Sequence, residues 1–445
     1  MAGRVEAAVD AVEGTESDSS AGDGLSLRTF SAFAVLAFRL LWINSFSFAL
    51  SQQIRQFAFV ILALDIGSGA VGVAIVSFSL GIPAMFLSLP AGVLADRVDR
   101  RLLLFGSQTA SMTLTIIAVV VIWADLMTLS FAVALAAMMG AVVAIGQPVR
   151  AALVPSLVEP RQLMNAVTLM SFGMNFSMIA GPAVGGAMIG LAGVGGAFTT
   201  QAALLFGGLI ALVPLRVPPP VQRAKRNVRS DVAEGFRFVV RTSYVRLLFG
   251  LLLVTALIAN GPFMTLLPQF AIEDLGASPF QASLLFAAMG IGMLMSSLVL
   301  ASIPYLERAG LWFMMTMVFG GALMFFVGIS PYYTLTCALM FFSGINAGLH
   351  VNLNQTLVQA YTPKAVMGRV MSIYMLVMMG AAPMGMLIAG MAASVVGAAN
   401  WYAVCGAGLM IAGIVAVMSQ RKVRGMSSMP KVSPEEAAQE LAKTP

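Results

Sequence analysis

Arg55 has the most unusual surroundings in the chain, because it lies within the otherwise apolar stretch 30–64. It precedes Leu64 by nine residues, about 14 Å along a helix, which is too far for the guanidinium to reach water easily at that end. Helical spacing gives this stretch a polar stripe of Asn44, Ser47, Ser51 and Arg55, with Gln52 and Gln56 beside it. A fixed positive charge there is suited to binding anionic or carbonyl-rich groups of a substrate. The alternative is a structural arginine held by backbone carbonyls or neighbouring amides.

The stretch NAGLHVNLNQ forms a second polar stripe and contains the only histidine of the chain. Asn346, His350 and Asn354 recur every four residues, so they share one helix face. An imidazole, with a reference pKa of about 6.5, can take up and release protons near neutral pH. His350 is therefore the candidate proton-coupling group, and the alternative is a neutral histidine hydrogen-bonded inside the protein. Asn260 is a further candidate substrate ligand.

The sequence lacks the residue patterns of a phosphate-binding loop and of a metal site. None of the five lysines follows a glycine, as a phosphate-cradling loop requires, and a lone histidine with Cys337 and Cys405 makes no usual metal site. We therefore expect no cofactor, no metal and no enzyme activity. An ion gradient remains as the energy source, although all 19 acidic residues fall in tails, loops or helix ends.

The elements that must position these residues are membrane-spanning helices. Hydrophobic residues make up 59% of the 445 residues, charged residues make up 10%, and the mean hydropathy is +0.92, which is typical of an integral membrane protein. Apolar runs of about 20 residues recur along the chain, and lipid leaves helices as the fitting structure for them. We predict twelve spans at 34–63, 69–93, 102–124, 128–149, 163–190, 196–215, 244–270, 279–303, 311–330, 333–358, 366–393 and 399–419.

Basic residues predict the orientation, because short loops rich in Lys and Arg stay in the cytoplasm. They follow the even-numbered spans, where Arg150 and Arg161 are placed in the loop after the fourth span. The alternate loops have no Lys or Arg and carry Asp65, Asp125, Glu273 and Asp274. Both termini are therefore expected in the cytoplasm, and the net charge of +6 requires no nucleic-acid partner.

The basic middle loop divides the spans into six and six. The predicted organisation is a disordered cytoplasmic tail (1–29), a six-helix half (30–215), a linker (216–243), a second six-helix half (244–420) and a second tail (421–445). A weak internal repeat supports this division, because EPRQLMNAVTLMSFG and TPKAVMGRVMSIYML align at Pro160 and Pro363. Within the linker, one helical face is expected to lie on the inner membrane surface, formed by Val232, Phe236, Val239 and Val240.

The segment GVLADRVDRR, residues 92–101, resembles the loop signature of the major facilitator superfamily. The resemblance implies a conformational latch between helix ends, formed by Gly92, Asp96, Arg97, Arg100 and Arg101. Asp99 departs from the pattern, which usually has glycine there.

The segment GPAVGG resembles a motif of exporters in that superfamily, which implies close helix packing at Gly181, Pro182, Gly185 and Gly186. Ordinary tight packing is the alternative interpretation, since small residues are common in membrane helices. Together with FRLLW, QPVRAALVPSLV and GRVMSIY, these motifs are similar to the enterobactin-exporter-like branch of drug and siderophore efflux proteins. Related exporters often carry an acid in the first span, where this chain has Gln52.

The resemblance implies an all-α integral membrane fold of twelve transmembrane helices in two pseudo-symmetric six-helix halves, with the first span at a central cavity. It implies a secondary active exporter, driven by protons or another ion, for a small amphipathic compound such as a siderophore or drug. We expect a monomer in the lipid bilayer of a bacterial inner membrane. The open alternatives are an importer or uniporter of an organic anion, and a non-transporting receptor or assembly factor.

Overall fold

The computed structural model describes residues 31–215, 228–303, 305–363 and 366–428. Within these ranges every regular element is a helix. The described residues exclude the first tail, linker residues 216–227 and residues 429–445 of the second tail, and the side chains of Gly92, Asp96 and Arg97 also lie outside them. The chain is therefore an all-α membrane protein, as its composition predicts.

The first group of helices ends with one that must be counted as two membrane spans. The elements are η1 (Ser31–Ala34), α2 (Leu36–Asp65), α3 (Gly69–Arg97), α4 (Arg100–Trp123), α5 (Leu129–Leu157), η2 (Pro160–Gln162) and α6 (Leu163–Leu212). With 50 residues, α6 is about 75 Å long, more than twice the hydrocarbon thickness of a bilayer. Its backbone leaves the helical region at Ala192 and at Gly193, where φ is +66°. That turn, which glycine allows at little cost, divides α6 into two antiparallel spans.

The second group of helices follows the linker. Its elements are α7 (Val228–Arg241), α8 (Ser243–Thr255), η3 (Ala256–Asn260), α9 (Gly261–Gln269), η4 (Phe270–Asp274), α10 (Pro279–Ala301), α11 (Ala309–Gly328), α12 (Tyr333–Ala360), α13 (Met367–Val396), α14 (Ala398–Ser419) and α15 (Arg421–Arg424). The elements from α8 to η4 form one span, which is interrupted by the π-turns η3 and η4. Pro262 and Pro268 lie in this span, and each lacks the N–H that a regular helix would use.

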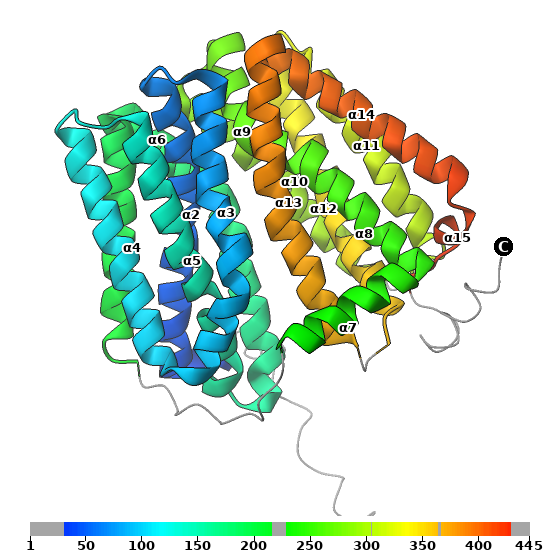
Figure 1. Cartoon of the computed structure of the whole chain (residues 1–445), viewed down its shortest axis with the longest axis horizontal. Coiled ribbons are helices and arrows are strands. Elements are labelled where there is room, and N and C mark those ends of the chain that lie inside the picture. Colours follow the sequence, from blue (N-terminus) through cyan, green and yellow to red (C-terminus); the bar gives the residue numbers. More distant parts are fainter. Residues whose placement is uncertain (1–30, 216–227, 304, 364–365, 429–445) are drawn as a thin grey trace, which may run out of the picture.

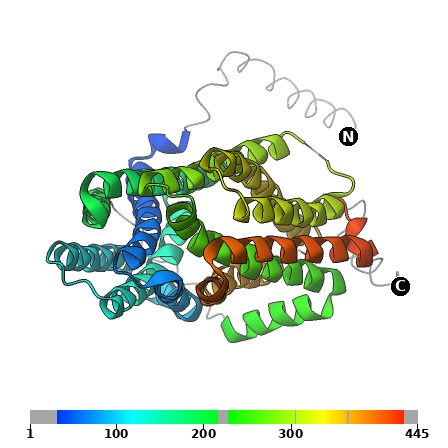
Figure 2. The ribbon, with the colours of Figure 1, turned by 90° about the horizontal axis from the view of Figure 1, so that it is seen from above.

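Eleven described helices or helix runs are long and apolar enough to cross a membrane, and counting α6 twice gives twelve spans. The helices form two groups that lie side by side (Figures 1 and 2). We call α2–α6 the first half and α8–α14 the second half. The basic end is the end of the molecule with Arg100, Arg308 and Arg421, and the acidic end is the end with Asp65, Asp125 and Asp274.

The apolar core differs between these two ends. At the acidic end both halves contribute to one core cluster, for example Ile54 and Phe198 from the first half and Leu266 and Leu285 from the second. At the basic end each half has a core of its own, with Phe38 and Leu153 in the first and Leu248, Phe313 and Leu357 in the second. Burial of apolar surface therefore joins the halves at the acidic end.

Candidate substrate pathway

Glycines allow the two halves to touch along two seams. A Cβ on Gly81 of α3 would collide with Pro383 of α13, and a Cβ on Gly390 of α13 would lie 2.6 Å from the carbonyl oxygen of Ala70. On the opposite side, a Cβ on Gly186 of α6 would lie 2.9 Å from the carbonyl oxygen of Pro279, at the start of α10. These contacts lie in the acidic-end half of their helices, so the two seams close the protein at that end.

The glycines of the GPAVGG segment serve two different contacts. Gly181 faces α2, where a Cβ would collide with Gln53, whereas Gly185 has only an ordinary contact with Ile54. Gly186 faces the second half, where a Cβ would collide with Ser283. Pro182 is buried inside α6. The segment therefore packs within the first half through Gly181 and across the seam through Gly186.

Asn44 belongs to a buried polar cluster inside the first half. Its Nδ2 donates to the carbonyl oxygen of Gly208 at 2.9 Å, and its Oδ1 accepts from Arg150 Nε at 3.3 Å. Arg150 Nη2 donates to Gln108 Oε1 at 2.6 Å, and Gln108 Nε2 donates to the carbonyl oxygen of Leu205 at 3.0 Å. The guanidinium carbon of Arg150 lies 3.6 Å from the ring centroid of Phe48, in a cation–π contact. We call Asn44, Phe48, Gln108 and Arg150 the Arg150 cluster. It connects α2, α4 and α5 to one another, and its hydrogen bonds to the carbonyl oxygens of Gly208 and Leu205 connect them to the second span of α6.

The prediction that Arg150 lies in a loop is wrong. Helix α5 continues past Pro148 and Pro155 to Leu157, so Arg150 lies about 10 Å inside the helix end and is 3% exposed. A proline usually ends or kinks a helix, but packing against three other helices supports this one. Sequence reasoning therefore missed Arg150 and Gln108 as interior polar residues. Gln108 lies inside the predicted span 102–124 and was a signal for an interior polar residue, whereas Arg150 follows the predicted end of the fourth span by one residue and gave none.

Other residues of the first stripe point in two directions. Ser51 is fully buried and donates to the carbonyl oxygen of Phe48 in its own helix. Arg55 is 5% exposed, and its Nε has no hydrogen-bond partner within the described part of the chain. Gln56 faces the second half, where its Nε2 lies 3.3 Å from the sulfur of Met264 on α9. Gln52 lies one turn before Gln56, and its buried Nε2 also lacks a described partner.

The second stripe places His350 in a neutral cluster inside the second half. His350 is 6% exposed, and its Nδ1 lies 2.8 Å from Thr316 Oγ1 on α11. Because that hydroxyl donates its single hydrogen to the carbonyl oxygen of Phe313 at 2.6 Å, the network assigns the ring proton to Nδ1. Nε2 is then a buried acceptor without a described partner. The ring also packs on Phe313, with 4.8 Å between centroids.

The asparagines near His350 bind backbone carbonyls of neighbouring helices. Asn346 Nδ2 donates to the carbonyl oxygen of Thr316 at 2.9 Å, and Asn354 Nδ2 donates to that of Leu248 at 3.4 Å. Asn354 Oδ1 is buried without a described partner. Asn260 ends the π-turn η3 and is half-buried. We call His350, Thr316 and Asn346 the His350 cluster.

The described part of the predicted latch ties helix ends within the first half. Arg100 Nη1 donates to the carbonyl oxygen of Ala152 on α5 at 3.3 Å, and Arg101 Nη2 donates to that of Val213 at 2.9 Å. Asp99 caps α4 by accepting from the backbone N–H of Arg101 at 2.8 Å. This cap gives a reason for the acid that departs from the superfamily pattern.

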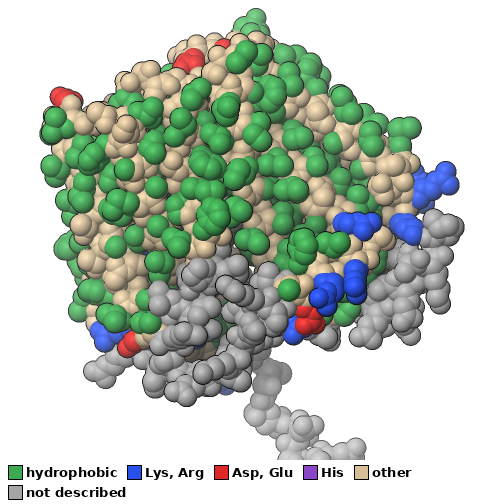
Figure 3. Space-filling model, in the orientation of Figure 1, with side chains coloured by type: hydrophobic (Ala, Val, Ile, Leu, Met, Phe, Trp, Pro, Cys, Tyr) green, Lys and Arg blue, Asp and Glu red, His purple; other side chains and the backbone are tan. Residues whose placement is uncertain are grey.

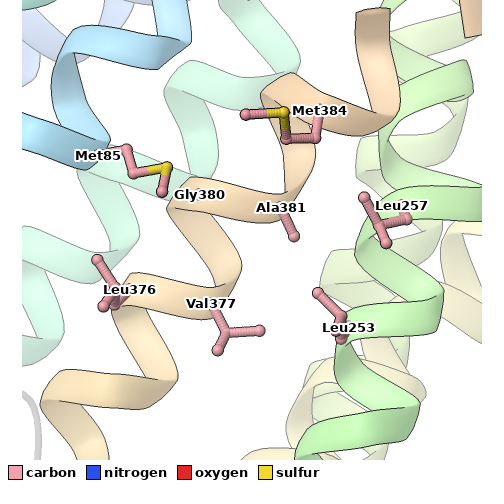
Figure 4. A pocket seen from close by; sticks show the side chains of 8 residues that line it. All are labelled: Met85, Leu253, Leu257, Leu376, Val377, Gly380, Ala381 and Met384. Atoms are coloured by element: carbon pink, nitrogen blue, oxygen red, sulfur yellow. The ribbon is translucent and has the colours of Figure 1, made fainter. Parts of the chain in front are cut away.

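An apolar pocket lies where the α3–α13 seam meets α8 (Figure 4). It is an open hollow of about 400 Å³, a size suited to a small molecule, and every lining side chain is apolar. The lining residues are Met85, Leu253, Leu257, Leu376, Val377, Gly380, Ala381 and Met384. Leu257 lies seven residues before Met264, the contact of Gln56, so the pocket and the polar face of α2 are about 10 Å apart along that span. Among the described residues no group of three His, Cys, Asp or Glu could hold a metal.

Comparison with known families decides the class of the protein. The model of the transmembrane secretion effector family matches residues 27–443, nearly the whole chain. The chain belongs to this family of the major facilitator superfamily. Its similarities are to transporters, so it is a membrane transporter and not an enzyme.

Curated relatives are enterobactin exporters of enteric bacteria. The chain is 26% identical to enterobactin exporter EntS of Citrobacter koseri over 283 residues, and 24% identical to that of Escherichia coli O1:K1 over 278 residues. Each alignment covers 62% of this chain and 66% of the relative, just under two thirds of the relative's length.

Solved transporters share the fold at low sequence identity. A bacterial homologue of the human lysosomal transporter Spinster, in an inward-facing and occupied conformation, has a TM-score of 0.66 at 13% identity, covering 95% of this chain and 98% of that one. The peptide transporter POT in complex with sulfate has a TM-score of 0.70 at 13% identity, covering 87% and 95%. At these identities the likeness concerns the fold alone.

Proposed function

We propose that this transporter is a secondary active exporter of a small amphipathic compound, such as a siderophore or drug, and that it works by alternating access. Its two halves rock about a substrate site between them, so that the site opens to one side of the membrane at a time. The coupling ion is the proton.

One observation carries the proposal of alternating access. The halves share a core and two glycine seams at the acidic end, whereas at the basic end their cores are separate. Such an arrangement is one of the two states that a rocking mechanism needs. In the other state the acidic-end seams separate and the basic ends meet.

Charge supports the orientation of this state. By the positive-inside rule, the proposed orientation has the basic end, with Arg100, Arg308 and Arg421, on the cytoplasmic side of the inner membrane. Both termini lie on that side in the proposed orientation. The side on which the two cores are separate is then the cytoplasmic one, from which an exporter collects its substrate.

The substrate class follows from the two kinds of surface near the middle of the membrane. The apolar pocket would hold the apolar part of an amphipathic compound. Gln52, Gln56 and Asn260 would bind its polar groups, and Arg55 would bind an anionic or carbonyl-rich group once the halves move. Asn44, Asn346 and Asn354 already bond to the protein, so their contribution is to hold the helices that carry these ligands. The enterobactin exporters among the relatives favour a siderophore.

Proton coupling is proposed at His350, because its Nε2 is a buried acceptor with no described partner. A proton arriving there would create an imidazolium, whose new donor needs an acceptor that the present arrangement does not supply. Protonation would therefore favour a different packing of α12, which links the proton to a change of state.

Efflux from proteoliposomes tests the proposal. A panel of siderophores and dyes is loaded, a pH gradient is imposed, and wild type is compared with Arg55→Ala and His350→Ala. We expect gradient-dependent flux in wild type, weakened substrate affinity in Arg55→Ala, and flux uncoupled from the gradient in His350→Ala. Gradient-independent flux in wild type would overturn proton coupling. Normal transport by both variants would show that neither residue has the proposed role.

Transport of an organic anion by import or uniport is the second candidate. It is favoured by Arg55, a buried cation that has no carboxylate partner among the described residues. Equal flux of an anionic substrate in both directions without a gradient would support it over export.

A further inference from the structure

Helix α7 carries two apolar faces, although a linker helix needs only one to pack on the protein. Gly235 and Val239 are buried against the second half, where a Cβ on Gly235 would lie 3.0 Å from the backbone of Arg369. Phe236 and Val240 are 60% and 42% exposed. Of the four residues predicted for one face, Val239 packs inward while Phe236 and Val240 point away, and the side chain of Val232 lies outside the described residues. Seen along the bundle, α7 lies at the outer edge of the second half (Figure 2).

Exposed positive charge accompanies the outward apolar face. Arg237 and Arg241 are exposed on α7, and neither has an ion-pair partner within the part of the chain that the structure describes. Figure 3 shows Lys and Arg side chains gathered among apolar ones at the basic end of the second half, over α7 and α15. Arginines beside an exposed phenylalanine and valine match the anionic headgroups and the outer acyl region of a bilayer leaflet.

The inward side of α7 is fastened to a helix that forms a seam between the halves. Glu234 of α7 pairs with Arg369 in the first turn of α13. Further along α13, Pro383 packs against Gly81 of the first half, and Gly380 faces Met85. Helix α13 therefore connects α7 to the α3–α13 seam.

We propose that α7 is a binding site for anionic phospholipid in the leaflet at the basic end, and that this binding regulates transport. Phe236 and Val240 enter the acyl region, and Arg237 and Arg241 bind headgroup phosphates. The Glu234–Arg369 pair carries the effect to α13 by fixing α7 to its first turn. This site is separate from the substrate pathway and does not depend on which compound is exported.

The depth of α7 in the bilayer is tested with Phe236→Trp, because the side chain of Phe236 is already exposed. The variant is placed in vesicles of phosphatidylglycerol and phosphatidylcholine with brominated acyl chains. The fluorescence of the four native tryptophans is measured in wild type under the same conditions and is subtracted. We expect quenching of the added fluorescence. An added signal that bromine does not quench would overturn the membrane site.

Lipid selectivity is tested with the double variant Arg237→Gln, Arg241→Gln in nanodiscs with and without phosphatidylglycerol. We expect the lipid to raise the melting temperature of wild type by several degrees and to raise its flux in matched vesicles, and both effects to be lost in the double variant. Arg161→Gln is the control, because its side chain is 81% exposed at the basic end of the first half, and it should respond like wild type. A response retained by the double variant, or reproduced by inorganic phosphate in phosphatidylcholine alone, would overturn the proposal.

The coupling to α13 is tested with Glu234→Gln, which removes the ion pair and leaves both exposed arginines in place. We expect this variant to keep the phosphatidylglycerol-dependent rise in melting temperature but to lose the stimulation of flux. Stimulation equal to that of wild type would overturn the coupling step, because regulation of flux by the lipid would then not require the ion pair. Because the melting experiment does not involve a substrate, it can fail or succeed whether or not the proposed export is correct.

Discussion

The two halves bury different polar groups. The first half buries a cation, Arg150, whose partners are the amides Asn44 and Gln108 and the face of Phe48. The second half buries a neutral imidazole, His350, whose partner is the hydroxyl of Thr316. The Arg150 cluster joins four spans through side chains and carbonyl oxygens, whereas the His350 cluster joins α11 and α12.

This difference teaches that burial alone does not mark a functional polar group. Arg150 uses Nε and Nη2 in hydrogen bonds and rests on an aromatic ring, so its charge is engaged in holding helices together. His350 keeps one nitrogen without a described partner, as Arg55 does with Nε. Arg150 Nη1 also lacks a described partner, so the contrast lies in the contacts that are made: Arg150 has two hydrogen bonds and an aromatic contact, whereas no hydrogen bond of the Arg55 side chain is described.

The largest effect is expected from Arg150→Met. The substitution leaves Asn44 Oδ1 and Gln108 Oε1 without their donor, and each buried acceptor so stranded costs roughly 1–3 kcal/mol. The free energy of unfolding should fall accordingly, which a melting curve of the purified protein in detergent would show. Arg161→Met is the matched control, because its ion pair with Glu159 is exposed and should be worth about 0.5 kcal/mol or less. Equal melting temperatures of Arg150→Met and Arg161→Met would contradict a structural role for Arg150.

A smaller effect on stability is expected from His350→Gln. Thr316 keeps its bond to the carbonyl oxygen of Phe313, and glutamine can still donate to the hydroxyl, so the loss should be about 1 kcal/mol. The pH dependence of flux near neutrality should nevertheless flatten, because the only imidazole of the chain is gone. Thr316→Val serves as the control that retains the imidazole. A pH profile that stays unchanged in His350→Gln would make the His350 cluster structural, like the Arg150 cluster.

The smallest effect on stability is expected from Arg55→Gln, since Arg55 Nε has no described partner to strand. Removing a buried cation without a counter-ion can leave the free energy of unfolding nearly unchanged. Affinity for an anionic substrate should fall instead, by roughly tenfold for one lost charge-assisted hydrogen bond. A titration of substrate binding, measured together with melting curves, would show a loss of affinity without a loss of stability. Loss of stability as large as that of Arg150→Met would assign Arg55 to the fold.

Much of the fold could be predicted from the sequence, because the length of a hydrophobic run indicates a membrane span and the distribution of basic residues indicates its orientation. The twelve spans are confirmed, and the turn between the fifth and sixth lies at Gly193. The extent of α5 could not be predicted, since Pro148 and Pro155 argue for an earlier end and only tertiary packing overrides them.

The candidate site was harder to predict than the fold. Helical spacing groups Asn44, Ser51 and Arg55 on one stripe, but spacing cannot say which neighbour a stripe faces. In the structure Asn44 faces Gly208 and Arg150, while Gln56 faces Met264 across the halves. A polar stripe on a membrane helix therefore predicts a protein-facing surface, and the choice between cavity and core needs the positions of the other helices.

A reversible cross-link across the acidic-end seam tests alternating access most directly. In a variant with Cys337 and Cys405 replaced by serine, Ile179→Cys and Gly290→Cys are introduced, where a Cβ on Gly290 would lie 3.3 Å from Ile179 Cβ, close to the spacing of a disulfide. Substrate flux is then measured in proteoliposomes before oxidation, after oxidation and after reduction. The account predicts flux that stops on oxidation and returns on reduction, because the seam between α6 and α10 must separate in every cycle. Undiminished flux through the fully cross-linked protein would contradict it.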